Sequence, residues 1–526
     1  MATQSQAITE GNPHRLNPWM IALAVILPTF MEVIDTSIAS VALPYIAGSL
    51  STSTEEATWV LTSYLVCNAI VLPITGWCAQ RFGRKRFLLI CIVIFTVASF
   101  MCGSATSLGM ILVARAVQGA GGGALQPMSQ SILLETFPPE KRGQAMALFG
   151  LGVVVAPILG PTLGGYLTDA YSWRWAFYIN IPVGILAFIM ISRYVFDPDY
   201  ITNARPGKLD GIGLGLLAVW LGCLQVILDK GQQDDWFGAT WIRWATLILF
   251  VAFIGFVVRM FRQKQPLVDL RIFRHRNFAL GCLLIALFGG CIYGLIILLP
   301  LFYQELLGYT AYNAGIAVSP RGLGAVIAMP IIGYLTAKLD NRWLIGGGFF
   351  LFGICGIWFG EVTLGISQWT FIWAIIISGF GSGMVFIPLS TTAVAYLSNE
   401  EMGNATGLYN LLRNVGGSIG ISITETLVTR HEQIHQTSLV GNLTPSGRMY
   451  QQRLAEGVGA LAPKIGHAMA GAGAIGRIYQ NLNQQAALLS YMDVFRYLGI
   501  ASFACLPVVW TLRKTVAKKG ARGAGH

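Results

Sequence analysis

The sequence contains few charged residues. Only 11% of its 526 residues are Asp, Glu, Lys or Arg, and 54% are hydrophobic, whereas a soluble domain carries roughly a quarter charged residues. Segments of about 20 mostly apolar residues, the length that crosses a bilayer, recur from Trp19 to Leu512. The sequence therefore predicts a polytopic membrane protein.

Motifs of enzymes and ATP-driven pumps are also missing. The sequence has no nucleophile-and-base motif and no Gly-Lys-Ser/Thr loop of the kind that cradles phosphates. Its nine cysteines lie in or beside predicted spans without metal-type spacing, which is typical of apolar packing residues, so we expect no metal and no cofactor. The six histidines all fall in predicted loops or tails, and any coupled protons must then be carried by carboxylates: His14, His275, His431, His435, His467 and His526.

Hydropathy predicts fourteen transmembrane helices. The first six are expected at 18–42, 57–78, 87–106, 108–134, 144–168 and 175–195. The other eight are expected at 209–229, 240–261, 278–302, 312–337, 343–363, 369–397, 404–428 and 491–512. The first is not a cleaved signal peptide, because it is too long and contains Glu32 and Asp35.

The net charge of +11 raises the alternative of a nucleic-acid partner, which the distribution of charge argues against. With the amino terminus inside, most basic residues fall in cytoplasmic segments, including Arg81–Arg86, Arg259–Arg276 and Arg513–Arg522. Basic residues concentrate on the cytoplasmic side of membrane proteins. We therefore expect a lipid bilayer around the chain, both termini in the cytoplasm and no nucleic acid.

The chain contains an internal repeat. The segment Gly76-Trp-Cys-Ala-Gln-Arg-Phe-Gly-Arg-Lys has a counterpart 257 residues later in Gly333-Tyr-Leu-Thr-Ala-Lys-Leu-Asp-Asn-Arg. Pro44 matches Pro300 at an offset of 256, and Gln126-Pro-Met-Ser matches Ile387-Pro-Leu-Ser at 261. The repeat equates helices 1 to 6 with helices 9 to 14 and leaves helices 7 and 8 as an inserted pair.

The predicted fold is thus an all-α polytopic membrane protein of two six-helix bundles plus two inserted helices. Carriers built from such repeats hold their substrate near the midplane between the halves. The predicted regions are a cytoplasmic tail (1–17), the first bundle (18–195), a linker with helices 7 and 8 (196–262), the second bundle (277–512) with a long periplasmic loop (430–490), and a basic cytoplasmic tail (513–526).

Two carboxylates and one arginine are predicted in the membrane interior of the first bundle. Glu32 and Asp35 are three residues apart on helix 1, where a carboxylate costs on the order of 3 kcal/mol to insert. Arg115 lies midway along helix 4 and keeps its charge, so it must meet a carboxylate, a backbone oxygen or water. These residues either couple transport to protons or form a structural ion pair.

Polar groups in other spans are candidates for a substrate cavity, although aromatic residues in spans more often pack in the core or at the interface. Two arginines of the second half, Arg321 and Arg413, either lie in the interior or snorkel to an interface. The candidate cavity residues are Trp59, Tyr64, Asn68, Gln118, Gln126, Tyr293, Arg321, Tyr409, Asn410 and Arg413.

Five signatures in order resemble the fourteen-helix drug:proton antiporter branch of the major facilitator superfamily, over essentially the whole chain. Three are the helix 1 segment Asp35-Thr-Ser-Ile-Ala-Ser-Val-Ala-Leu-Pro44, the helix 4 segment Arg115-Ala-Val-Gln-Gly119 and the loop motif Gly76–Arg86. The others are Ala156-Pro-Ile-Leu-Gly-Pro-Thr-Leu-Gly-Gly165 in helix 5 and Trp173-Arg-Trp-Ala-Phe-Tyr-Ile-Asn-Ile-Pro182 at the entry to helix 6.

The resemblance implies the major facilitator fold and roles for two of these motifs. A short basic loop can serve only to orient a protein in the membrane. The resemblance implies that this loop motif also acts in gating, through Gly76, Gln80, Arg81, Gly83, Arg84 and Lys85. Gln80 stands where relatives usually have Asp. The helix 5 motif indicates a kinked, closely packed helix and, by resemblance, a seal between the halves rather than generic packing: Pro157, Gly160, Pro161, Gly164 and Gly165.

The resemblance also implies a function. We expect a proton-coupled antiporter in the bacterial inner membrane that exports amphiphilic or hydrophobic toxic compounds. The alternative is an exporter of one endogenous metabolite, lipid or siderophore-like compound. Relatives work with a periplasmic adaptor protein and an outer-membrane channel, and the 430–490 segment, which is longer than two adjacent helices need, is expected to contact the adaptor.

Overall fold

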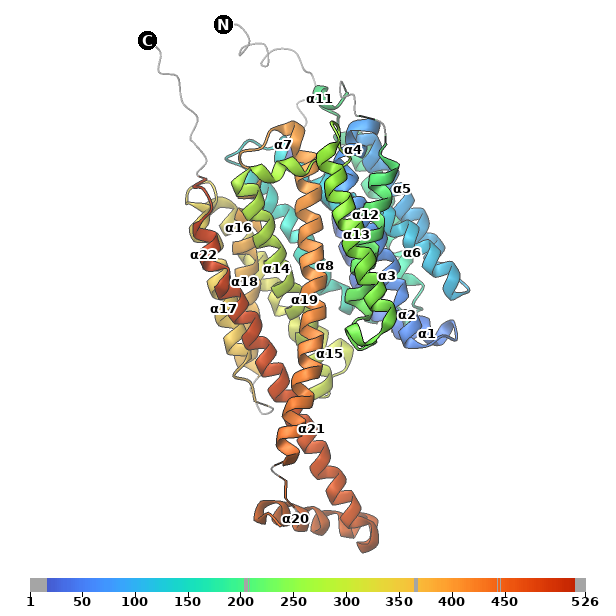
Figure 1. Cartoon of the computed structure of the whole chain (residues 1–526), viewed down its shortest axis with the longest axis vertical. Coiled ribbons are helices and arrows are strands. Elements are labelled where there is room, and N and C mark those ends of the chain that lie inside the picture. The colour runs from blue at the N-terminus through green and yellow to red at the C-terminus, as the bar shows by residue number, and fades with distance from the viewer. Residues whose placement is uncertain are drawn as a thin grey trace.

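The computed structural model describes residues 17–202, 207, 209–363, 368–441, 443–444 and 446–515, and within them every regular element is a helix (Figure 1). The first part contains α1 (Pro18–Ser49), α2 (Thr54–Ala57), α3 (Trp59–Val71), η1 (Leu72–Ile74), α4 (Thr75–Phe82), α5 (Arg84–Gly103), α6 (Leu108–Gly122), α7 (Leu125–Thr136), α8 (Arg142–Ala170), α9 (Trp175–Tyr178) and α10 (Asn180–Tyr194). The linker contains α11 (Asp199–Thr202), α12 (Gly211–Lys230), η2 (Trp236–Gly238), α13 (Thr240–Arg262) and η3 (Leu270–Arg274). The last part contains α14 (Arg276–Leu301), the π-turn η4 (Phe302–Leu306), α15 (Ala311–Val318), α16 (Pro320–Leu335), α17 (Asn341–Phe359), α18 (Gln368–Ala393), α19 (Asn399–Gly441), α20 (Arg448–Ile465), α21 (His467–Ala504) and α22 (Leu506–Trp510). Most of the two predicted tails, with His14 and His526, lies outside the described residues.

The helices match the predicted spans. Twelve helical segments among the described residues are long and apolar enough to cross a membrane. A thirteenth is α8, if its parts Arg142–Pro157 and Thr162–Ala170, which meet at 43°, cross together. The remaining predicted span, 404–428, lies within α19, which has 43 residues. Each of the fourteen predicted spans thus falls on a helix, and the prediction of an all-α polytopic membrane protein is confirmed.

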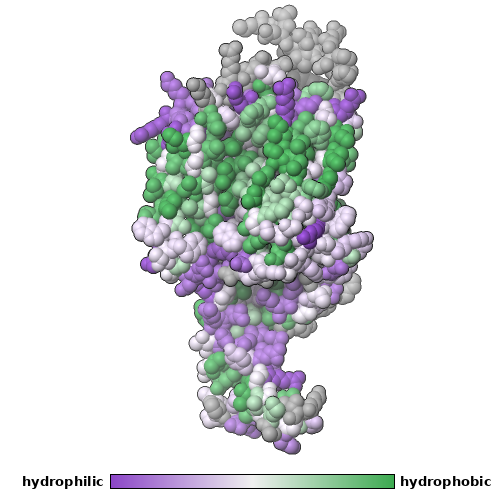
Figure 2. Space-filling model, turned by 90° about the vertical axis from the view of Figure 1, so that its right-hand side faces the viewer, coloured by the Kyte–Doolittle hydropathy of each residue, from purple (hydrophilic) through white to green (hydrophobic). Residues whose placement is uncertain are grey.

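On the face shown in Figure 2, apolar side chains form a band across the bundle, between two more polar ends. The linker helix α13 contributes exposed apolar side chains along its length, among them Trp244, Ile248, Val251 and Ile254. A helix that exposes such residues has its favourable environment in lipid. Its partner α12 packs on α3 and α19, so the inserted pair lies against both halves.

The two halves pack their helices in the same way. In the first half α1 packs on α8 and α10, α3 packs on α6, and α5 packs on α6 and α10. In the second half α14 packs on α19 and α21, α16 packs on α18, and α17 packs on α18 and α21. These are the pairs that the sequence repeat equates, so the repeat extends to the arrangement of the helices.

The halves meet closely at the end of the bundle where α1 begins and α22 ends, the upper end in Figure 1, which we call the terminal end. A Cβ atom on Gly76 of α4 would lie 2.8 Å from the backbone nitrogen of Asn404 on α19. A Cβ on Gly143 of α8 would lie 2.7 Å from the carbonyl oxygen of Gly333 on α16. Glycine therefore permits backbone contact at both places. Gly76 and Gly333 are also the residues that the repeat pairs.

The segment 430–490 is helical for most of its length, a feature that its Gln- and Gly-rich sequence did not indicate. The end of α19, α20 and the start of α21 project from the bundle at the end opposite the terminal end (Figure 1), and we call them the arm. His435 Nε2 lies 2.8 Å from Asp493 Oδ2, and Gln436 donates to Asn483 Oδ1 at 3.0 Å. These contacts tie the outgoing helix to the returning one.

Candidate functional site

Asp35 and Arg115 form an ion pair in the interior of the first half. The two side chains are fully buried, and Arg115 Nη1 lies 2.6 Å from Asp35 Oδ2. The structure thus gives Arg115 the carboxylate partner that its position required. An ion pair removed from water is stable only if further hydrogen bonds satisfy its remaining polar atoms.

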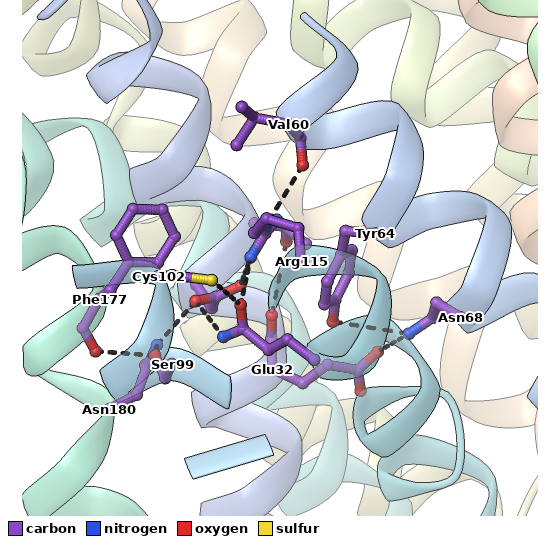
Figure 3. Close-up of polar contacts among 12 residues, drawn as sticks. Glu32, Val60, Tyr64, Asn68, Ser99, Cys102, Arg115, Phe177 and Asn180 are labelled. Atoms are coloured by element: carbon purple, nitrogen blue, oxygen red, sulfur yellow. Dashed lines mark hydrogen bonds and ion pairs between the residues drawn. The ribbon is translucent and has the colours of Figure 1, made fainter. Parts of the chain in front are cut away.

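Those further bonds come from α6 itself and from two other helices, α3 and α10 (Figure 3). The Asp35 Oδ1 atom accepts from Gln118 Nε2 at 2.9 Å and from Asn180 Nδ2 at 2.7 Å. The guanidinium of Arg115 donates to Gln118 Oε1 at 2.8 Å and, through Nε, to the carbonyl oxygen of Val60 at 3.1 Å. Asp35 is therefore held by a cation and two amides from α6 and α10.

Aromatic rings and a hydroxyl complete this network. Arg115 lies 4.2 Å from the ring centroid of Tyr64 and 5.6 Å from that of Phe177. Asn180 also donates to Ser99 Oγ at 2.9 Å, and Ser99 in turn donates to the carbonyl oxygen of Phe177 at 2.8 Å. The network thus joins α1, α3, α5, α6, α9 and α10.

A glycine explains how α6 comes close enough to α3. A Cβ on Gly119 would lie 2.3 Å from the carbonyl oxygen of Tyr64, which no side chain permits. Gly119 follows Arg115 by four residues, so it lies on the same face of α6. The Arg115–Gly119 signature therefore supplies both the cation and the contact that places α3 beside it.

Glu32 has a different environment from Asp35, although the two are close in sequence. It is 4% exposed, and its Oε1 accepts from Asn68 Nδ2 of α3 at 2.9 Å, while Asn68 lies 3.5 Å from the Tyr64 hydroxyl. Its second oxygen, Oε2, is buried with no hydrogen-bond partner among the described residues. Asp35 is thus fully bonded, whereas Glu32 retains one free oxygen.

Both arginines of the second half are buried in the protein rather than extended to an interface. Arg413 is 4% exposed and donates to Gln126 of α7. Arg321 is 3% exposed, and its two terminal nitrogens have no hydrogen-bond partner among the described residues. Neither is paired directly with a carboxylate in the described part of the chain.

The remaining candidate cavity residues do not form one surface. Tyr64, Asn68, Gln118, Tyr409 and Asn410 are each at most 3% exposed and pack inside the halves or between them. Tyr293 is half-buried, and its ring lies 2.5 Å from the Cβ position of Gly417.

Trp59 lies apart from this group. It is 37% exposed and lines a separate pocket of about 480 Å³ with Glu56, Val226, Lys230, Asp234 and Trp241.

The loop motif is fixed at the terminal end to α7 of its own half and to α11 of the linker. Arg84 donates through two nitrogens to the two Glu135 oxygens, each at 2.8 Å, and to the Tyr200 hydroxyl at 2.6 Å. Burial raises the pKa of the Tyr200 phenol, so this hydroxyl stays protonated. Gly83 has a φ of +84°, a backbone conformation that favours glycine.

The next residue of the motif, Lys85, is bound both to the last turn of α10 and to the segment that follows it. The Lys85 backbone nitrogen donates to Asp197 at 2.7 Å, and its ammonium donates to the Ser192 carbonyl oxygen at 2.6 Å. Gln80 is half-buried, and Arg81 is exposed.

The helix 5 motif packs on α1 within its own half. A Cβ on Gly160 would lie 2.4 Å from Ser37 Cβ, and one on Gly164 would lie 3.2 Å from Ile38 Cγ2. The carbonyl oxygen of Pro157 accepts from Ser37 Oγ at 3.2 Å. Gly165 has open space around its Cβ position, and the side chain of Pro161 lies outside the described residues. These glycines position α1, the helix that carries Asp35, and a seal between the halves stays a prediction.

Several residues of the network were not singled out in the sequence. Asn180 lies in the segment Trp173–Pro182, where an amide inside an apolar span was a signal that could have been used. Ser99 carries no such signal, because serine occurs in many spans. Gln118 was expected in a substrate cavity; the structure bonds it to Asp35 and Arg115, and its contact with substrate stays a prediction.

Comparisons with known proteins agree with this architecture. The model of the Major Facilitator Superfamily matches residues 25–421. The chain is 38% identical to the multidrug export protein EmrB of Escherichia coli K12 over 512 residues, which cover 96% of this chain and 98% of EmrB. It is 36% identical to the fatty acid resistance protein FarB of Neisseria gonorrhoeae, with 96% and 97% covered.

Solved structures of the same superfamily share the fold. The human organic anion transporter MFSD10 superposes with a TM-score of 0.58 at 14% identity, covering 93% of this chain and all of that one. The proton:xylose symporter XylE superposes with a TM-score of 0.57 at 12% identity, covering 95% and 97%. The two six-helix halves with an inserted pair therefore form the major facilitator fold.

Proposed function

This chain belongs to the major facilitator superfamily, and we propose that it is a multidrug exporter that moves amphiphilic or hydrophobic toxic compounds out of the cell in exchange for protons. The observation that carries the proposal is the buried Asp35–Arg115 pair within a chain similar over nearly its whole length to multidrug export proteins. An ionisable pair inside a membrane protein is expensive to maintain and usually functional.

Asp35 is the proposed proton carrier. Its negative charge is balanced by Arg115 and bonded by Gln118 and Asn180. Protonation would weaken the attraction to Arg115 and leave the arginine with excess charge, so the gain or loss of one proton changes the packing of α1 against α6 and α10. Rocking of one half against the other then carries the change to the other side of the membrane.

The pumped compounds are proposed to be chemically diverse, since the relatives named above include a fatty acid resistance protein as well as multidrug exporters. A similar protein of Acinetobacter baumannii, 30% identical over 92% of this chain, is named for colistin resistance. Competition for transport between a medium-chain fatty acid and a lipophilic dye cation in one liposome preparation tests this breadth. Transport of a single compound without competition would favour the narrower exporter of one metabolite or lipid.

The terminal end is proposed to face the cytoplasm of a bacterial inner membrane. Its basic residues include Arg81, Arg86, Arg262 and Arg274, which is the arrangement that the positive-inside rule describes. The arm would then project into the periplasm. Protease digestion of right-side-out and inverted vesicles tests this orientation, with cleavage of the arm expected only in the first.

The arm is the proposed contact for a periplasmic adaptor protein, through which an outer-membrane channel would be reached. It projects beyond the bundle and exposes large apolar side chains, including Ile434, Met449, Met469 and Tyr479. Replacement of Gly441–Gly466 by a short Gly-Ser linker should preserve proton-driven transport in inverted vesicles and lower drug resistance of intact cells. Full resistance of such cells would contradict the adaptor role.

A further inference from the structure

Arg413 and Glu32 are opposite charges that approach each other from opposite halves. Glu32 belongs to α1 of the first half, and its Oε2 atom is buried without a hydrogen-bond partner among the described residues. Arg413 belongs to α19 of the second half, and its Nε and Nη1 atoms are likewise buried without a partner in the part of the chain that the structure describes. Buried charges with unsatisfied atoms are costly to a protein, so an attraction between these two side chains would stabilise the state in which the halves meet at the terminal end.

Helix α7, which carries Gln126, packs on both of the helices that carry the two charges, α1 and α19. The side-chain oxygen of Gln126 accepts from Arg413 Nη2. A flexible amide can donate to a carboxylate and accept from a guanidinium at once. Arg413 is therefore bonded, across the boundary between the halves, to a helix that also packs on α1.

Few other charges act on Glu32. They are Asp35 on its own helix and Arg413 on α19, while α3 contributes the neutral side chains Tyr64 and Asn68. The charged residues of α8 and α10, which also pack on α1, stand near the ends of those helices: Arg142, Asp169 and Arg193. Asp35 is already paired with Arg115, so Arg413 is the cation available to Glu32.

We infer that Glu32 and Arg413 form a proton-controlled link between the halves, in which charged Glu32 attracts Arg413 through or past Gln126 and protonated Glu32 releases it. The inference deepens the proposed proton exchange and rests on it. Loss of the proton would favour closure of the terminal end, where α19 meets α4, and uptake of a proton would favour its opening. Arg413 is in this scheme a coupling residue and not part of the substrate cavity.

A neighbouring contact provides a matched control. One turn away on α19, Asn410 Nδ2 donates to Gln130 Oε1 of α7 at 2.6 Å. This hydrogen bond joins the same two helices across the same boundary but involves no charge. A Gln130→Leu substitution therefore weakens the contact between the halves without altering the charges near Glu32.

The test measures closure of the terminal end as a function of pH. Spin labels are placed on the full-length protein in liposomes at Phe82→Cys and Leu339→Cys, two exposed positions in different halves, with the half-buried Cys67 and Cys223 replaced by Ser. Distances between the labels are measured by electron spin resonance from pH 5 to pH 9. In the otherwise wild-type protein, the ratio of closed to open molecules should rise with pH by about tenfold or more.

Four variants decide the outcome. Glu32→Gln and Arg413→Gln should each remove the pH response, and the double variant should add nothing to either single one, because both changes break the same pair. Arg413→Lys keeps the positive charge and should therefore keep the pH response. Gln130→Leu should leave the midpoint pH of closure at its wild-type value. A wild-type midpoint in Glu32→Gln or Arg413→Gln, or no pH response in the wild-type protein, would overturn the inference.

Failure of the proposed function would be visible separately. Liposomes that contain wild-type protein and show no proton movement upon addition of the dye cation or fatty acid would refute proton exchange itself. If Arg413→Gln still exchanges protons and the midpoint pH of its closure is unchanged, the proposed function is supported and only the Glu32–Arg413 link is refuted.

Discussion

The two halves of the molecule use the same backbone contact to place different side chains. In the first half, Gly119 of α6 lies against the carbonyl oxygen of Tyr64 on α3, and in the second half Gly379 of α18 lies against that of Arg321 on α16. The Cβ positions of these glycines are 2.3 and 2.0 Å from those oxygens. Arg321 follows Tyr64 by 257 residues, the offset of the loop motifs, so the repeat preserves this contact.

The charges have not been preserved in the same way. At the offset of 256 that matches Pro44 with Pro300, the counterpart of Asp35 is Cys291. The first half thus has a bonded pair, in which Tyr64 covers Arg115, whereas in the second half the terminal nitrogens of Arg321 have no partner among the described residues. The comparison teaches that the scaffold is symmetric and the proposed proton chemistry is concentrated in one half.

Breaking the pair in the first half should have the largest effect on stability. Arg115→Leu leaves Asp35 buried without its cation, and we expect the free energy of unfolding to fall by about 3–5 kcal/mol. Thermal unfolding in detergent, followed by tryptophan fluorescence, measures the change. The double variant Asp35→Leu/Arg115→Leu should recover most of the stability, because no unpaired charge remains, and should not recover transport. Unchanged stability of Arg115→Leu would show that Asp35 does not need Arg115 to balance its charge.

The shared glycine contact should be equally sensitive in both halves. Gly119→Ala and Gly379→Ala each place a methyl group against a carbonyl oxygen, so each should destabilise the protein by about 1–3 kcal/mol. Gly165→Ala is the control, since nothing lies within 4 Å of its Cβ position. If only one of the two variants were destabilised, the packing of the halves would be less symmetric than the repeat indicates.

Removal of Arg321, the buried arginine of α16, should give a small effect of opposite sign. Arg321→Met removes a buried cation whose terminal nitrogens have no partner in the described part of the chain. We expect the free energy of unfolding to rise by about 1 kcal/mol, because replacing an unsatisfied buried charge by an apolar side chain is often stabilising. The same thermal assay checks it. A clear loss of stability would show that Arg321 has a structural partner, and that both halves therefore contain a paired buried arginine.

Much of the fold could be predicted because membrane helices leave a direct signal in hydropathy. The spans and the repeat follow from apolar windows and from a few spaced glycines and prolines such as Gly76, Pro44 and Pro300. The arm was expected as a loop, because its composition is polar, but α19 and α21 continue as helices that support each other through pairs such as His435 and Asp493.

The candidate site could be predicted only in part. A buried arginine needs a counter-charge, so Arg115 and a helix 1 carboxylate were identifiable from the sequence. Which carboxylate it contacts depends on the rotation of α1, which the three-residue spacing of Glu32 and Asp35 does not fix. Asn180 and Ser99 join the network through the packing of α5 and α10, and no pattern within one helix encodes that.

The most direct test of proton exchange compares wild-type protein with Asp35→Asn in liposomes that contain a pH-sensitive dye. Asparagine keeps the size of the side chain and its hydrogen-bonding oxygen but cannot exchange a proton. Addition of the lipophilic dye cation should move protons across wild-type liposomes and produce no proton movement with Asp35→Asn, whose folding is verified by the thermal assay. Proton movement at the wild-type rate in Asp35→Asn would contradict the account.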